Sequence, residues 1–298
     1  MKTLLVIAGP TAVGKTAISI DVAEQLNTAI ISADSRQCYR EMSIGTAKPS
    51  VEELARVSHY FVGEFSVREE ISAARFERLA LSYLDEIFAR SDTAICCGGT
   101  GLYIRALCEG LDQMPTVDAV VVQAVEEGRR TGGTAWLQAR VKEEDPRFFA
   151  EGERENPARL QRALEFIRTT GQSILTYQSG IKKERPFRIV KARLELPRTV
   201  LYDRINRRVD DMIEAGLPEE VRSLLPLRHL RPLQTVGYAE LFEHFDGRMT
   251  LEEAVEKIKQ HTRNYAKRQM TWFRKEDTMA GIDASAENVV EQILALVR

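Results

Sequence analysis

The feature of this sequence that most constrains its fold is the segment Gly9-Pro10-Thr11-Ala12-Val13-Gly14-Lys15-Thr16. It follows an apolar run over 3–8 and precedes a helical pattern over 17–26, which indicates a strand, a glycine-rich loop and a helix. This context supports the phosphate-loop pattern G-x-x-x-x-G-K-[ST]. The glycines let the backbone curl around one anion, Lys15 adds a positive charge, and Thr16 offers a hydroxyl to a magnesium ion. We therefore expect all eight residues to bind a polyphosphate.

The length and composition of the chain fit a large globular domain with an additional segment. The chain has 298 residues, of which 44% are hydrophobic and 29% charged, enough for a full core. No window reaches about 18 consecutive apolar residues, and the first strand leaves no room for a signal peptide. We therefore expect a cytoplasmic protein that does not bind a membrane. The formal net charge of −2 means that any nucleic-acid binding must come from a local basic cluster.

The four cysteines are Cys38, Cys96, Cys97 and Cys108. They show no metal-ligand spacing, and two of them are adjacent on a probable buried strand. We expect four reduced thiols.

Strand and helix patterns alternate along most of the chain, which predicts a parallel α/β sheet flanked by helices. Further strand patterns cover 29–34, 92–97 and 187–195, and helical patterns cover 51–60, 72–90, 102–109, 201–215, 218–225 and 251–274. The second strand ends in Asp34 and the third in Gly98-Gly99-Thr100-Gly101. Loops at the carboxyl ends of parallel strands face the ligand, so Asp34 should lie near the phosphate loop.

Residues 115–181 differ in character from the rest of the chain. They contain helical segments around 118–130, 134–142 and 157–170 but no strong strand pattern. We interpret them as a helical insertion in a core domain formed by 1–114 and 182–298.

The helix predicted over 251–274 carries the best nucleic-acid signal. From Lys257 to Lys275 there are seven Lys or Arg residues and no acid. A helical wheel places Ile258, Thr262, Tyr265, Gln269 and Trp272 on one face and Lys259, Arg263, Lys267, Met270 and Arg274 on the other. A face of one sign suggests phosphate contacts, although a merely solvated face is the alternative. A second basic run, 182–193, has six basic residues and one acid.

Seven segments together resemble the tRNA dimethylallyltransferases of bacteria, also called tRNA isopentenyltransferases. They are GPTAVGKT (9–16), SADSRQCYR (32–40), IGTAKP (44–49), GGTGLYIRAL (98–107), NPARLQRALE (156–165), QTVGY (234–238) and TRNYAKRQMTWFR (262–274). The resemblance implies a P-loop NTPase-like parallel sheet with a helical insertion that binds tRNA. It also implies a phosphate loop that can take nucleotides such as ATP.

The activity that the resemblance implies is transfer of a dimethylallyl group from dimethylallyl diphosphate, with Mg²⁺ as cofactor. The acceptor is N6 of the adenosine 3′ of the anticodon, position 37, in tRNAs that read codons starting with U. The products are N6-isopentenyladenosine and diphosphate, and we expect a monomer.

Catalytic functions follow from matching these motifs to the chemistry. An exocyclic purine amine is a poor nucleophile, so we expect Asp34 to take its proton, unless this carboxylate only supports magnesium or caps a helix. The leaving diphosphate needs positive charge, which we expect from Lys15, from Mg²⁺ on Thr16, and from Arg204 or Arg208. Both arginines could equally be solvated. Thr100, on the family's GGTG turn, should contact the diphosphate or the adenine amine, or else support a turn.

The target adenine should be flipped out of the anticodon loop into a channel. The residues expected to contact tRNA are Asp34, Ser35, Arg36, Gln37, Thr100, Arg159, Gln161, Arg162, Gln234, Thr235, Gly237, Tyr238, Arg263, Lys267 and Arg274. The alternative for Tyr238 is a buried position in the core, without contact to RNA. Two positions depart from the family: Arg36 replaces a common methionine, and Val122 aligns where bacterial relatives often carry arginine. We expect His59 to be a hydrogen-bonded structural residue.

Three other functions fit parts of the sequence. A small-metabolite kinase would use the phosphate loop, with Asp34 binding the acceptor hydroxyl. An isopentenyltransferase that accepts AMP would keep the chemistry without tRNA. An RNA-binding protein switched by a nucleotide would leave GGTG and Asp34 without a function. The basic helix and the insertion argue against the first two, because a mononucleotide needs neither.

Overall fold

The computed structural model describes residues 1–298 and divides them into two compact units. The first unit comprises 1–109 and 184–298, and the second comprises 110–183. The second unit is slightly longer at both ends than the predicted insertion.

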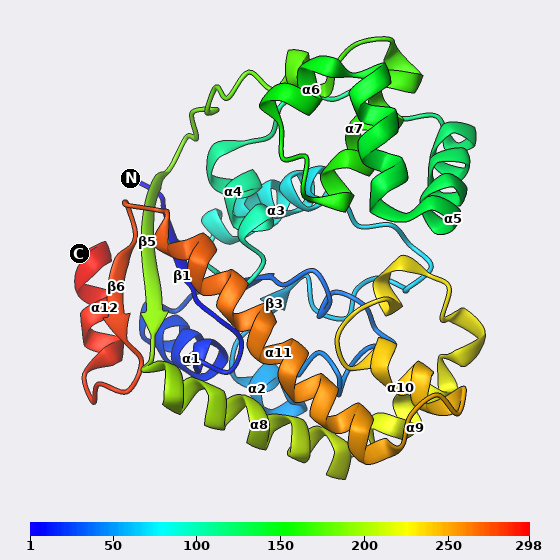
Figure 1. Cartoon of the computed structure of the whole chain (residues 1–298). Helices are drawn as coiled ribbons and strands as arrows, with labels where there is room; N and C mark the ends of the chain where they lie inside the picture. The colour runs from blue at the N-terminus through cyan, green and yellow to red at the C-terminus, as the bar shows by residue number, and fades with distance from the viewer. The chain divides into compact units, whose positions relative to one another are not determined.

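The first unit contains a six-stranded sheet in the order β3-β2-β4-β1-β5-β6 (Figure 1). The strands are β1 (Thr3–Ala8), β2 (Ile30–Ala33), β3 (His59–Tyr60), β4 (Thr93–Gly98), β5 (Arg188–Glu195) and β6 (Ala280–Asp283). All pairs are parallel, so the carboxyl ends of the strands share one edge. This confirms the predicted fold class. The edge strand β3 lies in a predicted helix, and the edge strand β6 was not predicted.

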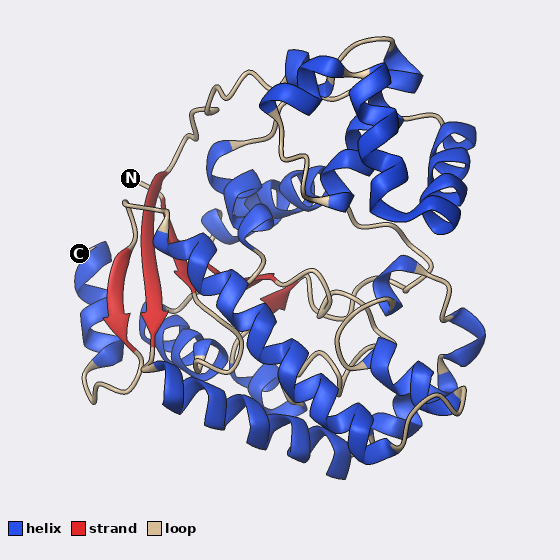
Figure 2. Ribbon diagram, viewed as in Figure 1, coloured by secondary structure: helices blue, strands red, loops and turns tan.

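Helices cover both faces of this sheet (Figure 2). They are α1 (Lys15–Leu26), α2 (Val51–Arg56), α3 (Ala73–Phe88), α4 (Gly101–Glu109), α8 (Arg198–Glu214), α9 (Leu217–Ser223), α10 (Tyr238–Phe245), α11 (Leu251–Arg274) and α12 (Val289–Val297). Leu4 and Val6 of β1 face a core shared with α3, α4 and α10. Leu5 and Ile7 face a second core with α1, α8 and α12. This alternation follows from the two-residue period of a strand that is buried on both faces.

Helix α11 begins with a capping box. The Glu253 N–H donates to Thr250 Oγ1 over 3.2 Å, and the Thr250 N–H donates to Glu253 Oε2 over 2.8 Å, which satisfies two otherwise unpaired donors. Figure 1 shows α11 (orange) running beside α8.

That packing corrects the basic face predicted for α11. Lys259 pairs with Asp210 at 2.8 Å, and Arg263 donates to Asn206 Oδ1 at 2.6 Å, so both side chains contact α8. Met270, placed on the same face, packs into the core that α8 shares. The basic side chains Lys257, Lys267, Arg268, Arg274 and Lys275 remain exposed.

The second basic run is also largely paired within the first unit. The buried Arg185 forms an ion pair with Glu77 at 2.8 Å and donates to the carbonyls of Ala106 and Leu107, both at 2.8 Å. Lys191 lies 3.4 Å from Glu276, and Arg193 lies 2.7 Å from Glu195. These contacts hold the chain against the end of α4 where it re-enters the first unit, so these three side chains do not form an open phosphate-binding surface.

The second unit is helical and has its own core. It contains the helices α5 (Ala119–Glu144), α6 (Pro146–Glu151) and α7 (Pro157–Thr170) and the 3₁₀ helix η1 (Ile174–Tyr177). These elements pack around buried side chains such as Leu137, Leu164 and Phe166. Helix α5 is broken at Gly133, whose φ is 63°. The short helix α6 lies between the predicted helical segments and was not expected. It begins at Pro146 because Asp145 accepts the Phe148 N–H and proline is favourable in the first turn.

The remaining short elements of the first unit are the 3₁₀ helices η2 (Leu225–Leu227) and η3 (Arg231–Leu233). The four cysteines form no disulfide, as expected. No helix combines the length and apolar character that crossing a membrane requires.

Candidate active site

A cavity of about 450 Å³ lies where β1, β2 and β4 end in the first unit. Most of the phosphate loop lines it, together with Asp34, Gln37, Thr46, Ala47, Lys48, Pro49, Gly98, Gly99, Arg204, Arg208, Tyr265 and Gln269. The sheet thus brings Asp34 into the same cavity as the loop, because both follow parallel strands that end at one edge.

The phosphate loop forms an anion-binding cradle. Gly14 has a φ of 106° directly before α1, and no side chain caps the start of this helix. The first N–H groups of α1 can therefore bind an anion, assisted by the helix dipole. The Lys15 ammonium folds back and donates to the Pro10 carbonyl over 2.7 Å. Burial lowers the pKa of Lys15 to about 8; the Arg208 guanidinium adds to this effect, while Cys97 and Asp34 oppose it.

Two arginines of α8 extend the positive charge of the cradle. Arg204 and Arg208 lie one helical turn apart, and both line the cavity. Arg204 Nη1 lies 3.4 Å from the Val13 carbonyl oxygen, so it contacts the loop itself. Burial lowers the pKa of Arg208, and the carboxylates of Asp34 and Glu53 oppose the shift. The structure therefore brings both candidate arginines to the site, where the sequence left the choice open.

The Asp34 carboxylate is oriented by the turn that follows it. Its Oδ1 accepts the N–H groups of Arg36, at 2.8 Å, and Gln37, at 3.2 Å. These two bonds fix the side chain, and Oδ2 accepts no hydrogen bond from the protein. A carboxylate held by one oxygen with the other unbonded can accept a proton from a bound substrate.

Thr100 lies behind the cavity wall. Its Oγ1 accepts the Ser35 N–H at 3.1 Å and lies 3.4 Å from Ser35 Oγ. It does not line the cavity, which matches the alternative of a turn-supporting threonine. Tyr265 of α11 lines the cavity instead, and burial, with the nearby Asp34, raises its pKa to about 12. In the sequence, Tyr265 is recognisable only as part of the face of the predicted helix that also carries Ile258 and Trp272.

Gln269 is a site residue that sequence reasoning missed. Its Oε1 accepts the Thr11 N–H and its Nε2 donates to the Gly99 carbonyl, both at 2.9 Å. A side chain at position 99 would come within 2.2 Å of Gln269 Nε2, so only glycine permits this approach. The buried amide thus joins the phosphate loop to the GGTG turn. The available signal was a glutamine on the otherwise apolar face of α11.

The residues expected to contact tRNA lie in several places. Gln37 lines the cavity, whereas Ser35 and Arg36 are half-buried outside it. Gln234 is exposed and Thr235 half-buried. Gly237 and Tyr238 are buried, and the Tyr238 hydroxyl donates to Glu220 over 2.6 Å. This is the core position that the sequence analysis kept as the alternative for Tyr238.

Three further expected contacts belong to α7 of the second unit. Arg159 pairs with Glu153 at 3.1 Å, Gln161 donates to Glu126 at 3.0 Å, and Arg162 lies over the ring of Phe166. Both arginine side chains are about half exposed (51% and 45%), so they remain accessible to a ligand.

His59 also lines the cavity. Its Nδ1 lies 2.8 Å from the Val57 carbonyl, in keeping with the predicted structural bond. Burial lowers its pKa, and Glu53, unnoticed in the sequence, lies near enough to oppose the shift.

The cavity provides suitable oxygen donors for a magnesium ion. The Thr16 hydroxyl and the Asp34 carboxylate both line it, and Mg²⁺ prefers such hard ligands. No group of three or more His, Cys, Asp or Glu side chains forms a metal cage. This donor set fits an ion that is bound mainly through substrate phosphates and water.

The parallel sheet, the phosphate loop after its β1 strand and the cationic cradle define a phosphate-loop α/β protein. The family model described as IPP transferase matches residues 37–276. The chain is 44% identical over 296 residues to "tRNA dimethylallyltransferase 1" of Bacteroides thetaiotaomicron, covering 99% of this chain and 96% of that protein.

Solved structures agree with these sequence matches. The tRNA isopentenylpyrophosphate transferase of Bacillus halodurans superposes with a TM-score of 0.72 at 36% identity, covering 99% of this chain and 94% of that one. A eukaryotic dimethylallyltransferase captured acting on tRNA has a TM-score of 0.78 at 25% identity, covering 99% of this chain and 78% of that one. The chain belongs to the tRNA dimethylallyltransferase family.

Proposed function

We propose that this protein transfers the dimethylallyl group of dimethylallyl diphosphate to N6 of an adenosine in tRNA. The observation that carries the proposal is the composition of one cavity, which is lined by the phosphate loop with its Lys15, by Arg204 and Arg208, and by Asp34. This arrangement combines an anion cradle with a proton acceptor, as an amine attacking an allylic diphosphate requires.

In the proposed reaction N6 of adenine attacks C1 of the dimethylallyl group, a C–N bond forms, and the C–O bond to the diphosphate breaks. Asp34 accepts the proton that N6 loses. The cradle, Lys15 and the two arginines stabilise the charge that the departing diphosphate gathers. A magnesium ion held by Thr16, with Asp34 close by, would neutralise further charge on the diphosphate. Gln269 keeps the loop and the GGTG turn in register.

The acceptor we propose is adenosine 37, next to the anticodon, in tRNAs that read codons starting with U. A base in a stacked loop cannot present N6 inside a cavity, so it must be flipped out. The exposed basic residues of α11 and the arginines of α7 are the proposed contacts for the anticodon stem-loop. We further propose a cytoplasmic monomer.

An acceptor assay tests the proposed function. The protein is incubated with Mg²⁺ and dimethylallyl diphosphate or ATP, together with AMP or unmodified tRNA, and diphosphate release and product masses are measured. We expect product only from dimethylallyl diphosphate with tRNA, and nuclease digestion should place the added mass on adenosine 37. Prenylated AMP would support the AMP-accepting enzyme instead. Phosphoryl transfer from ATP would support the kinase, and no transfer at all would overturn the proposal.

A further inference from the structure

Residues 34–49 form one wall of the cavity but contain no helix or extended strand. Gln37, which lines the cavity, donates through Nε2 to the carbonyls of Thr46, at 3.2 Å, and Ala47, at 2.9 Å. The position of Gln37 therefore depends on the turn over 43–47. Ala47 has a φ of 46°, an unfavourable conformation for a residue other than glycine. Such a turn needs support from the surrounding structure.

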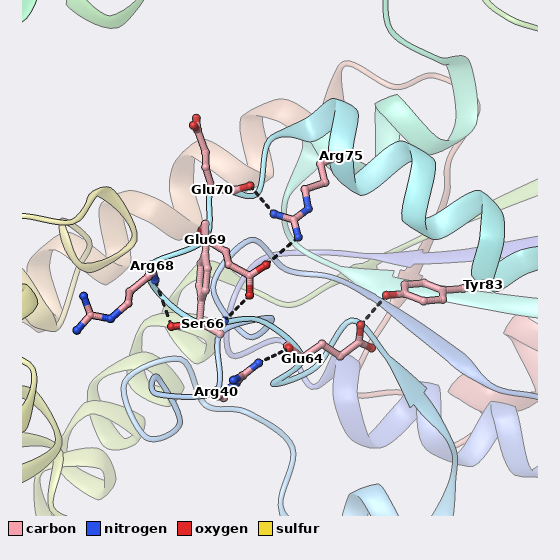
Figure 3. Close-up of polar contacts among 9 residues, drawn as sticks. Arg40, Glu64, Ser66, Arg68, Glu69, Glu70, Arg75 and Tyr83 are labelled. Atoms are coloured by element: carbon pink, nitrogen blue, oxygen red, sulfur yellow. Dashed lines mark hydrogen bonds and ion pairs between the residues drawn. The ribbon is translucent and has the colours of Figure 1, made fainter. Parts of the chain in front are cut away.

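The segment after β3 supports only the first part of this wall. Arg40 Nη2 donates to the Glu64 carbonyl over 2.7 Å, and Glu64 in turn accepts the Tyr83 hydroxyl of α3 (Figure 3). Figure 3 also shows Arg75 bound to Glu69 and to the Glu70 carbonyl, which fixes the same segment on α3. These contacts hold the backbone around residue 40. None of them reaches the turn over 43–47.

Besides bonds from Gln37, Thr46 and Lys48 within the wall itself, that turn is held by one carboxylate from α9. Glu220 Oε2 accepts the N–H groups of Ser43, at 3.0 Å, and Ile44, at 2.8 Å, and Oε1 accepts the N–H of Gly45, at 3.1 Å. The fourth donor is the Tyr238 hydroxyl, at 2.6 Å from Oε1. One carboxylate thus accepts three consecutive backbone N–H groups of the turn. These bonds are strong because hydrogen bonds to an ionised acceptor are stronger than those between neutral groups.

The Tyr238 side chain supports the same turn through its ring as well as through its hydroxyl. Its fully buried ring lies against Gly45, where an added Cβ would approach a ring carbon to 2.6 Å. Burial and the Glu220 carboxylate raise the pKa of Tyr238 far above its usual range, so it stays a donor. The preceding Gly237 N–H donates to the buried Glu240 over 2.8 Å, and Glu240 lies 2.5 Å from His261 of α11.

We propose that Glu220, with Tyr238, is a positioning residue that sets the acceptor side of the cavity. By holding the turn over 43–47 it fixes Gln37 and, through the turn over 34–37, the Asp34 carboxylate. The inference rests on the proposed function and assigns a shared structural task to two motifs, IGTAKP and QTVGY. Tyr238 thereby acts through the protein and not by contact with RNA.

The substitution Glu220→Gln tests this inference with little change of shape. An amide has one acceptor oxygen and directs an NH₂ group at donors, so some of the four hydrogen bonds must be lost. We expect kcat with tRNA to fall by roughly tenfold or more, as the loss of charge-assisted bonds suggests. The Kd for dimethylallyl diphosphate, measured by calorimetry without tRNA, should change less than about threefold, because Glu220 does not contact the phosphate loop. Tyr238→Phe removes one donor and should have a smaller effect of the same kind.

The matched control is Glu219→Gln, an exposed carboxylate on the same helix, which should behave like the wild type. In an Asp34→Asn background Glu220→Gln should add little, because the group it positions is already disabled. Normal kcat in Glu220→Gln, full additivity, or an equal loss of dimethylallyl diphosphate affinity would overturn the inference.

Hydrogen exchange keeps this test independent of activity. Peptides covering 34–49 should exchange faster in Glu220→Gln than in Glu219→Gln, while peptides covering 9–16 should not change. Unchanged exchange over 34–49 would overturn the inference even if the wild type were inactive. An inactive wild type with the expected exchange pattern would overturn only the proposed function.

Discussion

The two sides of the cavity are built in different ways. The phosphate loop is eight consecutive residues, and its backbone N–H groups and Lys15 are the proposed ligands of the anion. The opposite wall, 34–49, is irregular and depends on Glu220, Tyr238 and Gln37. The proposed anion site is thus built mainly from consecutive residues, with two arginines added by α8, whereas the wall over 34–49 depends on Glu220 and Tyr238, which are distant from it in sequence. Substitutions should therefore separate donor binding from acceptor chemistry.

The largest expected effect is on the donor side. Lys15→Ala removes a half-buried cation next to the proposed position of the leaving diphosphate and should raise the barrier by on the order of 3 kcal/mol, roughly a hundredfold or more in turnover. Its affinity for dimethylallyl diphosphate should also fall, while the thermal melting temperature stays near that of the wild type. Steady-state kinetics and calorimetry measure these effects. A variant with near-normal turnover would remove the loop lysine from the mechanism.

Asp34→Asn should affect the acceptor side alone. The amide preserves size and can still accept the N–H groups of Arg36 and Gln37, but it cannot take the proton from N6. Single-turnover rates should fall roughly 100-fold, with the Kd values for tRNA and dimethylallyl diphosphate little changed. If tRNA affinity falls instead, Asp34 is a binding group and the comparison between the two sides loses its chemical basis.

Gln269→Ala should impair both sides because this amide joins the phosphate loop to the GGTG turn, whose Thr100 accepts the Ser35 N–H of the wall over 34–49. Leaving the Thr11 N–H and the Gly99 carbonyl without partners should cost about 1 to 3 kcal/mol in unfolding free energy. We expect a roughly tenfold loss in both donor affinity and turnover, if the lost bonds act on the bound state to a similar extent. Gln260→Ala, on the exposed side of α11, is the control for chemical denaturation and kinetics. A loss confined to one side would show that the two motifs are not coupled through Gln269.

The donor side should also depend on pH through Lys15. Its pKa near 8 in the free protein means that its charge is lost as the pH rises through 8, and a bound diphosphate would raise that pKa again. The affinity for dimethylallyl diphosphate should therefore decline as the pH rises through 8, by about tenfold between pH 7 and pH 9. Calorimetry from pH 7 to 10 in two buffers would also detect the proton taken up. The same titration of Lys15→Ala should be flat; an equal decline there would assign the effect to another group.

The smallest expected effect concerns the exposed basic part of α11. Lys267, Arg268 and Lys275 line one open groove, and changing all three to Ala should flatten the slope of log K for tRNA against log salt by roughly two units. Donor affinity should not change. Lys259 and Arg263 contact α8. Changing both to Ala should lower the melting temperature of the protein and leave the salt slope for tRNA nearly unchanged. Equal slopes in the triple variant and the wild type would support an acceptor without a phosphate backbone, such as AMP.

The sequence was sufficient for features defined by neighbouring residues. The phosphate loop, the central strands and the position of Asp34 follow from short patterns and from the geometry of parallel sheets. The edge strand β3 has only two residues, too few for a period to be recognised. The edge strand β6 buries only Ile282 and so lacks the apolar run that identifies β2, which has the same length.

Contacts between distant segments could not be predicted in this way. A helical wheel describes one helix and cannot show that α8 covers Lys259 and Arg263. For the same reason Gln269 and Glu220 gave no local signal of their partners. Tyr238 was expected to contact RNA only because its segment, QTVGY, resembles one of the family's RNA-contacting segments.

The buried Arg185 has a consequence for how the chain is assembled. Its bonds to Glu77 and to the carbonyls of Ala106 and Leu107 bring the two ends of the second unit together at the end of α4. Residues 110–183 are therefore an insertion whose two ends meet at one place in the first unit. The entropic cost of closing such a loop grows only slowly with its length. A change in the length of this insertion should therefore cost the sheet and its cavity little stability.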